Sequence, residues 1–337
     1  MAIHLWGISQ AEQSVERAEQ RLETKAETVE REAESSESLG YALGLLGWAI
    51  AASVFVAVKV VEDEMPAWSI AFGRVLITAL VMTPFLFAHF HEARAFLRKH
   101  WLHALVIGSL GLGFAQGLML NALHLTTAVN AGIVFALSPI LTLVFARLVL
   151  REAMSSWQGF GALIAFSGVV TVTVQGDINR LASLQIGTGE IFAFCAACCF
   201  AAYTIALKKA NFQLGRLTLL AVLLMGGVIG TAPFALYEYL SGAHDNLTRN
   251  GYFALIYCAV IGGAVLYALF NWSVDILGAG RAGTLVYSQP IFIAILAWIL
   301  LGERLEWYHY LGAAIVTLGV VIVLTTQPKP TPQKSPG

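Results

Sequence analysis

Charged residues are scarce in this sequence. They make up 12% of its 337 residues, whereas a soluble domain carries about 25%. Apolar residues account for 58%, and the mean hydropathy is +0.72. One globule of this size cannot hide so much apolar surface, so the composition predicts an all-α membrane protein.

Cysteines and catalytic motifs are scarce too. The sequence has no nucleophile–base pair, no metal-ligand spacing and no phosphate-binding loop. Its basic residues are scattered over short loops, which is not the pattern of nucleic-acid binding. We therefore expect no enzyme activity, no cofactor or metal and no nucleic-acid partner. Four cysteines lie in apolar runs, where packing is the favoured role and redox or metal chemistry the alternative: Cys195, Cys198, Cys199 and Cys258.

Long apolar runs are abundant. Ten of them have about 20 residues each, the length that spans a bilayer. They are residues 41–61, 67–90, 102–124, 127–149, 156–175, 187–207, 216–240, 251–274, 281–301 and 307–326. With the N-terminus inside, cytoplasmic loops carry nine lysines and arginines and outer loops carry four. This asymmetry predicts a multi-pass inner-membrane protein with both termini in the cytoplasm.

Residues 1–39 form an acidic extension. Nine acidic and four basic residues lie between positions 11 and 38, and Val15, Leu22 and Val29 recur every seven positions. The pattern predicts a cytoplasmic helix, with two interpretations. Either it is a mobile solvated extension, or residues 10–38 bind a protein partner and the chain is a transporter-like scaffold or sensor. The proline-rich tail, residues 327–337, is predicted to be disordered.

The sequence repeats itself with a shift of 151 residues. Residues 111–132 align with 262–283, and Pro139 aligns with Pro290. The first repeat is predicted to cover residues 40–175 and the second 187–326, with five segments each. Five is an odd number, so the two copies cross the membrane in opposite directions. The predicted fold is ten transmembrane helices in two inverted five-helix repeats, an arrangement typical of transporters with a midplane substrate site.

The two aligned prolines indicate where that site lies. Proline removes a backbone hydrogen bond and bends a helix, which is tolerated where protein or a cavity satisfies the freed carbonyl. Pro139 follows Ser138, and Pro290 follows Gln289. We therefore expect two helix kinks beside a cavity, the alternative being that membrane helices simply contain more proline.

Five stretches, in order, resemble the drug/metabolite transporter superfamily, EamA type. They are ASVFVAVKVV (52–61), FGRVLITALVMTPFL (72–86), SPILTLVFARLVLRE (138–152), SQPIFIAILAWILLGERL (288–305) and GAAIVTLGVVIV (312–323). The resemblance covers nearly all of residues 40–326. It implies ten helices, cytoplasmic termini and a central cavity lined mainly by helices 1, 3, 4, 6, 8 and 9. It also implies movement of small solutes, often outwards.

Two departures from that family bear on the substrate. Many relatives have glutamate before the second proline, where this chain has Gln289, and a neutral amide carries no proton at neutral pH. Residues 41–58 contain no acid, whereas related small multidrug exporters use a first-helix glutamate for cationic drugs. The first departure disfavours a proton-coupling role for position 289, and the second disfavours export of cationic drugs.

Neutral polar and aromatic residues in the apolar segments are the predicted substrate-binding residues. They indicate a mildly polar, aromatic cavity, which suits neutral or zwitterionic solutes such as amino acids better than phosphates. We therefore expect a secondary transporter of small metabolites, exporting them by alternating access. The candidates are Trp48, Ser53, Gln116, Ser138, Tyr203, Tyr267, Asn271, Tyr287 and Gln289.

Two charges inside the segments are either pathway or structural residues. Lys59 either faces the pathway or extends to the surface beside Glu62. Arg74 is expected to pair with the acids at positions 62–64 and to clasp the first two helices, because intramembrane charges commonly pair. Glu303 is expected to form hydrogen bonds between helices.

Overall fold

The computed structural model describes residues 37–59, 62–151, 155–177, 187–210, 212–242, 247–277, 282 and 285–325. All regular secondary structure within these ranges is helical, as predicted for an all-α membrane protein. The acidic extension up to residue 36 and the tail from residue 326 lie outside them. The hypothesis of a partner-binding segment at residues 10–38 therefore concerns, apart from its last two residues, a part of the chain that is not described.

Seven helices in the described ranges are long and apolar enough to cross a membrane. Three of them are composite, because π-helical turns or a break interrupt them. The seven are Glu37–Lys59; α2 (Ala67–Ala88); α3 (Phe90–Gly108) with η1 (Ser109–Phe114) and α4 (Ala115–Leu125); α5 (Ala128–Phe135) with α6 (Ser138–Phe145) and η2 (Ala146–Leu150); α9 (Thr188–Ala210); α10 (Arg216–Leu240); and α11 (Arg249–Ala259) with η3 (Val260–Val265) and α12 (Leu266–Leu277).

Further helices occupy the positions of the fifth, ninth and tenth predicted segments. They are α7 (Ser156–Thr173), η4 (Leu285–Ser288) followed by α14 (Gln289–Leu296) and η5 (Ala297–Leu301), and α15 (Trp307–Thr325). The count of ten membrane crossings stays a prediction.

The 151-residue repeat is visible in the backbone. A shift of 151 places η1 on η3 and η2 on η5, residue for residue. It also places Arg151 on Gly302, and both are left-handed residues that end their helices. π-Helical turns are rare and frequently mark functional sites. Four of them at equivalent positions show that the two repeats share their irregular features as well as their helices.

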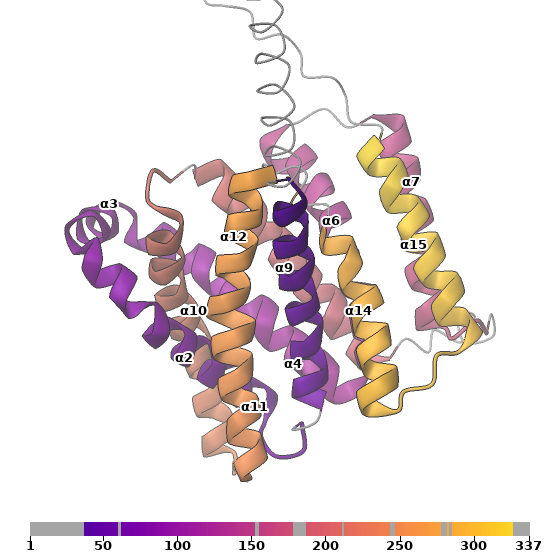
Figure 1. Cartoon of the computed structure of the whole chain (residues 1–337), viewed down its shortest axis with the longest axis horizontal. Coiled ribbons are helices and arrows are strands. Elements are labelled where there is room, and N and C mark those ends of the chain that lie inside the picture. Colours follow the sequence, from indigo (N-terminus) through magenta and orange to yellow (C-terminus); the bar gives the residue numbers. More distant parts are fainter. Residues whose placement is uncertain are drawn as a thin grey trace, which may run out of the picture.

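The helices α7 and α15, one from each repeat, pack closely through their backbones. A Cβ added to Gly168 would lie 2.7 Å from the carbonyl oxygen of Gly312, and one added to Gly319 would meet the carbonyl oxygen of Gly161. The repeat shift converts the first contact into the second, so the two contacts are equivalent. As the residue number rises along α7, that of its partner falls, so the two helices run antiparallel. Figure 1 shows them side by side at one edge of the molecule.

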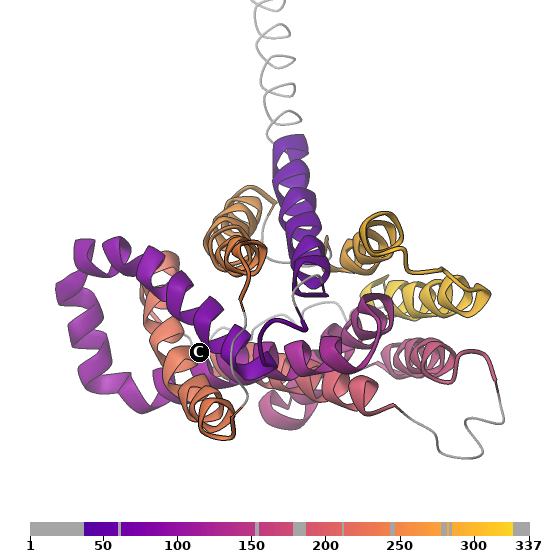
Figure 2. The same cartoon turned by 90° about the horizontal axis from the view of Figure 1, so that it is seen from below.

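A second pair of equivalent helices, α2 and α10, has the same arrangement. Trp68 at the start of α2 stacks on Phe234 near the end of α10, with ring centroids 4.4 Å apart. Further along α2, Val75 lies against Gly227. These helices also run antiparallel, so equivalent helices of the two repeats point in opposite directions. The view in Figure 2 places α2, α3 and α10 on one side and α7 with α15 on the other.

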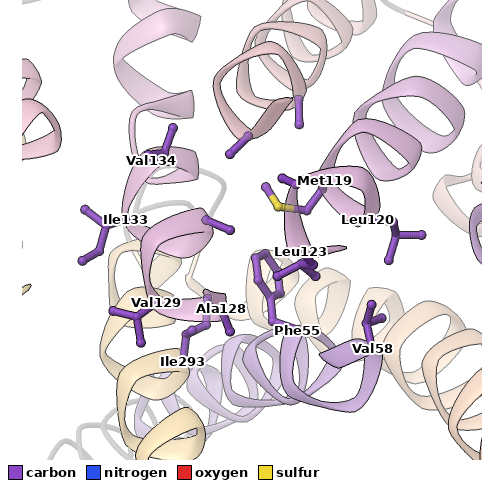
Figure 3. Close-up of a cluster of buried hydrophobic side chains, with 14 of the residues drawn as sticks. Phe55, Val58, Met119, Leu120, Leu123, Ala128, Val129, Ile133, Val134 and Ile293 are labelled. Atoms are coloured by element: carbon purple, nitrogen blue, oxygen red, sulfur yellow. The ribbon is translucent and has the colours of Figure 1, made fainter. Parts of the chain in front are cut away.

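A hydrophobic cluster near the end of the first helix contains residues of both repeats. Phe55 and Val58 of that helix pack with residues 119–123 of α4 and 128–134 of α5. Ile293 of α14 joins them from the second repeat (Figure 3). These side chains therefore belong to one hydrophobic core that both repeats share.

The two aligned prolines lie at helix starts. Residues 136 and 137 separate α5 from α6, and Pro139 lies in the first turn of α6. Pro290 has the same place in α14, directly after the 3-10 turn η4. Proline is favourable in a first turn because its missing N–H has no helical partner there. Each helix is therefore broken just before its proline.

Candidate functional site

Arg74 is the centre of a polar group inside the bundle. Its Nη1 donates to Oε1 of Gln116 on α4 at 2.8 Å. Its Nε donates to the carbonyl oxygen of Cys258 at 3.1 Å, and Nη2 donates to that of Gly262 at 3.2 Å. Thr78, one turn further along α2, donates to the carbonyl oxygen of Ala259 at 2.8 Å. Together these bonds attach α2 of the first repeat to α11 and η3 of the second.

Two predicted tyrosines adjoin this group. Tyr267 is close enough to Arg74 and to Tyr203 to interact electrostatically with both. Tyr203 of α9 covers Gly111 of η1, where any Cβ would overlap its ring. Gln116 and Tyr267 are equivalent under the repeat shift, and each is the second residue after its π-helix, η1 or η3. The structure thus brings together three predicted binding residues, Gln116, Tyr203 and Tyr267, around Arg74.

The predicted pairing of Arg74 with the acids at positions 62–64 is wrong. Among the described residues, all hydrogen-bond acceptors of Arg74 are neutral: one side-chain amide and two backbone carbonyls. The acids have other partners, since Glu62 pairs with Lys59 and Glu64 accepts from the backbone N–H of Thr248. Arg74 lies about two turns into α2, and its carbonyl acceptors are Cys258 of α11 and Gly262 of the π-helix η3.

Trp48 and Ser53 lie on the first helix. The indole N–H of Trp48 is buried and has no acceptor among the described residues. Its ring meets Phe270 edge-on, with centroids 5.9 Å apart. The hydroxyl of Ser53 lies 2.6 Å from that of Tyr257. An unpaired buried donor is costly, so the Trp48 N–H is suited to a polar ligand.

Of the remaining predicted binding residues, Asn271 bonds to the backbone of Tyr267 in the Arg74 group, whereas Ser138 and Gln289 are separate from that group. Ser138 and Gln289, at the two helix breaks, expose only 1% and 6% of their surface. Within the described residues neither forms a hydrogen bond with Arg74, Gln116 or Tyr267. Asn271 donates to the carbonyl oxygen of Tyr267, one turn earlier in α12, at 2.7 Å. The side chains of Tyr287 and Pro290 lie outside the described part of the chain.

Lys59 ends the first helix as an ion-pair partner. Its Nζ lies 2.7 Å from Oε2 of Glu62, and both side chains are mostly buried. This contact favours the structural interpretation of Lys59 over a place in the pathway.

Sequence analysis did not identify a buried polar network that we call the Asn130 network: Thr126, Asn130, Glu190 and His309. The Asn130 amide donates to Oε1 of Glu190 at 3.1 Å, and its Oδ1 lies 3.2 Å from Nε2 of His309. Thr126 donates to the same Glu190 oxygen at 2.6 Å. The backbone N–H of Glu306 donates to Nδ1 of His309, so Nε2 carries the proton and donates to Asn130. The network joins α5 of the first repeat to α9 and α15 of the second.

Three glutamates form further hydrogen bonds between the repeats at the end of the bundle where the Asn130 network lies. Glu303 accepts from the backbone N–H groups of Ala128 and Val129 at 3.0 and 3.4 Å, which confirms the predicted inter-helix bonds. Glu64 accepts from Thr248, and Glu238 accepts from the backbone N–H of Ser69 at 2.8 Å. Carboxylates at helix N-termini complement the positive end of the helix dipole. Each of these glutamates belongs to one repeat and binds the other.

These features define a class of protein: a helical membrane protein of two oppositely directed repeats, with a polar group where the repeats meet. The EamA-like transporter family matches residues 38–174 and 187–325, one copy in each repeat. The chain therefore belongs to the EamA-like transporter family and is a membrane transporter. This confirms the resemblance to the drug/metabolite transporter superfamily found in the sequence.

Relatives extend over most of the chain. It is 24% identical to the "Uncharacterized transporter YyaM" of Bacillus subtilis over 278 residues, covering 82% of this chain and 91% of that protein. It is 27% identical to an "Uncharacterized transporter" of Archaeoglobus fulgidus over 291 residues, covering 85% and 96%. A solved crystal structure has a TM-score of 0.56 at 18% identity, covering 87% of this chain and 96% of that one, which shows a shared fold.

Proposed function

We propose that the protein is an inner-membrane secondary transporter that exports small neutral or zwitterionic metabolites, such as amino acids, by alternating access. In this proposal ten helices span the membrane, with both termini in the cytoplasm. Residues 40–175 and 187–326 are the two inverted repeats, residues 1–39 a cytoplasmic extension and residues 327–337 a tail. The lipid bilayer and a small-molecule substrate are its partners, and it needs no cofactor.

The observation that carries the proposal is the polar group around Arg74. Arg74 and Gln116 come from the first repeat, and Tyr267 and Tyr203 come from the second. They meet beside η1 and η3, where the helical hydrogen-bond pattern changes in both repeats. Inverted-repeat transporters place their substrate between the halves at irregular helices. Aromatic walls with a few polar groups suit a small solute that has an apolar part.

The contacts between the repeats support alternating access. At the end where the first helix finishes, the Asn130 network and Glu303 bind the two repeats together. At the opposite end, the described ion pair between Arg216 and Asp275 is exposed and lies within the second repeat. We infer that the bonds between the repeats close the end of the bundle where the first helix finishes. With the N-terminus inside, that end is the outer one, and export requires those bonds to open.

A ligand screen tests the proposed function. The purified full-length chain is melted in detergent with panels of amino acids, nucleosides, sugars, sugar phosphates and cationic drugs. A ligand at about 100 times its Kd stabilises the folded state by roughly 2.7 kcal/mol. Compounds that raise the Tm are then tested for counterflow in proteoliposomes.

We expect amino acids with apolar side chains to raise the Tm and to undergo counterflow. Stabilisation by phosphates or cationic drugs alone would contradict the proposed substrate class. Net efflux of such an amino acid from preloaded cells, faster with the protein than without it, is the result expected of an exporter.

Gln289→Glu is expected to make transport and stability depend on pH. Gln289 exposes only 6% of its surface. Near pH 5 a protonated glutamic acid resembles the glutamine, whereas ionisation at higher pH places a poorly hydrated charge at the helix break. We therefore expect near-normal Tm and flux in acid and a progressive loss of both towards pH 8, measured on one preparation.

Gln158→Glu is the matched control. Gln158 is equally buried, but its Oε1 accepts from the backbone N–H of Ser155 at the start of α7, where a carboxylate is favourable. This variant should show the wild-type pH profile. A flat profile for Gln289→Glu as well would show that position 289 tolerates a charge and does not lie in a dry helix break.

A further inference from the structure

Arg74 carries a positive charge with no described negative partner. Its three hydrogen bonds end on the Gln116 amide and on two backbone carbonyls. A guanidinium has five N–H donors, so one N–H on each terminal nitrogen has no acceptor among the described residues. A charge inside a membrane is costly and is usually retained for pairing or for function. The neutral acceptors orient the guanidinium but leave its charge uncompensated.

The fold itself does not require arginine at this place. Pro84 of α2 and Pro233 of α10 lie inside equivalent helices, and aligning these prolines, with an offset of 149 rather than 151 residues, pairs Arg74 with Leu223. Leu223 exposes 1% of its surface, and its backbone carbonyl lies against Gly108, directly before η1. An apolar residue therefore occupies the equivalent place in the other repeat, and the helix pair does not need a charge there.

The surroundings of Arg74 fit one particular ligand group. The two unused N–H donors lie on the terminal nitrogens, which can donate together to the two oxygens of a carboxylate. Tyr267, which lies near Arg74, adds a phenolic hydroxyl. One arginine balances a monocarboxylate, whereas a phosphate or a dicarboxylate would bring more charge than this group offsets.

We propose that Arg74 binds the carboxylate of the transported solute and selects carboxylates over the matching amides and amines. This inference rests on the proposed function and refines it, since it assigns the zwitterion's negative end to Arg74. Gln116 and the carbonyl oxygens of Cys258 and Gly262 then act as positioning groups. They hold the guanidinium in one orientation, while the ligand supplies the missing negative charge.

The test uses matched sets of small probes. One set is L-phenylalanine, L-phenylalaninamide and phenylethylamine, and the other is L-leucine, L-leucinamide and isoamylamine. The Kd of each is measured on the purified full-length chain from the dependence of Tm on ligand concentration. A hydrogen-bonded pair with a charged group corresponds to a preference of about 10- to 100-fold for each amino acid over its amide.

Variants assign that preference to Arg74. Arg74→Gln should bring the ratio between amino acid and amide close to one while binding of the amide persists, which also shows that the variant is folded. Arg74→Lys should retain part of the preference, because the charge remains and the fork geometry is lost. Arg216→Gln, which removes an exposed arginine paired with Asp275, should leave the ratio unchanged.

Each outcome decides whether Arg74 binds the carboxylate of the solute. If the wild type binds amino acids and amides equally, or if Arg74→Gln keeps the preference, Arg74 is a structural clamp and the proposed function still stands. If neither set binds while phosphates or cationic drugs do, the proposed substrate class and the role of Arg74 fail together. If Arg74→Gln does not fold, the wild-type ratio and its reduction in Arg74→Lys give the answer.

Discussion

Replacing Asn130 with leucine is expected to lower the free energy of unfolding by roughly 2 to 4 kcal/mol, because two buried bonds are lost and one of them ends on a charge. Asn130 exposes 4% of its surface and joins Glu190 to His309. Leucine fills a similar volume but cannot donate to the carboxylate or accept from the imidazole. Among the described residues, Glu190 would keep only its bond from Thr126, and the Nε2–H of His309 would lose its acceptor. Thermal and denaturant unfolding in detergent measure the loss.

Asn121→Leu is the matched control for this prediction. Asn121 is partly buried, and its amide donates to the carbonyl oxygen of Gly117 one turn earlier in the same helix. Its removal breaks no described hydrogen bond between helices, so it should cost less than about 1 kcal/mol. Equal losses for the two variants would show that Asn130 stabilises only its own helix.

Local hydrogen exchange separates loss of the inter-repeat contact from general weakening. The Asn130 network lies at the end of the bundle where Glu303 also binds α5. Asn130→Leu should therefore increase amide exchange around residues 126–130 and 187–191 before it does so in α2 or α10. Local opening begins at the least stable contacts of a structure. A uniform increase of amide exchange across the chain would therefore contradict a gating role for the Asn130 network.

The sequence predicted the repeats more completely than it predicted their contacts. A shift of 151 residues identified Gln116 with Tyr267 and Pro139 with Pro290, because hydrophobic patterns and glycines recur in both copies. It also gave the opposite directions of the copies, which the antiparallel pairing of α7 with α15 now shows. These features follow from segment count and composition, which a single sequence contains in full.

The partners of Arg74 and Asn130 could not be predicted in this way. Arg74 bonds to backbone carbonyls at and beside a π-helix. The residue types of a segment do not predict that its helix will contain a π-helical turn. Gly262 and Gly263 lie close against Val54 and Thr78, and the carbonyl of Gly262 also accepts from Arg74. Asn130 is one polar residue in an apolar run, and single polar residues commonly join neighbouring helices in membranes. Only the fold shows that Glu190 and His309 meet it from two different helices.

Gly168→Ala is expected to destabilise the protein by about 1 to 3 kcal/mol, the usual cost of overpacking a close contact. A Cβ there would lie 2.7 Å from the carbonyl oxygen of Gly312 and 2.8 Å from the backbone N of Val316. Both are backbone atoms and cannot rotate away, so α7 and α15 must separate. Gly319→Ala makes the equivalent change on the other helix, against the backbone of Ala165, and should cost a similar amount. Both effects are measured as changes in Tm and in denaturant midpoint.

Gly47→Ala supplies a control with the opposite sign. Its Cβ would meet Leu266 at 3.5 Å, an ordinary contact. In the interior of a helix alanine is then favoured over glycine by about 0.5 to 1 kcal/mol, so this variant should be as stable as the wild type or more so. Similar losses at positions 168 and 319, with none at 47, would show that the α7–α15 contact obeys the repeat symmetry. A loss at only one of the two equivalent glycines would mean that the helices can slide to relieve one contact but not the other, and the inter-repeat packing would then be asymmetric.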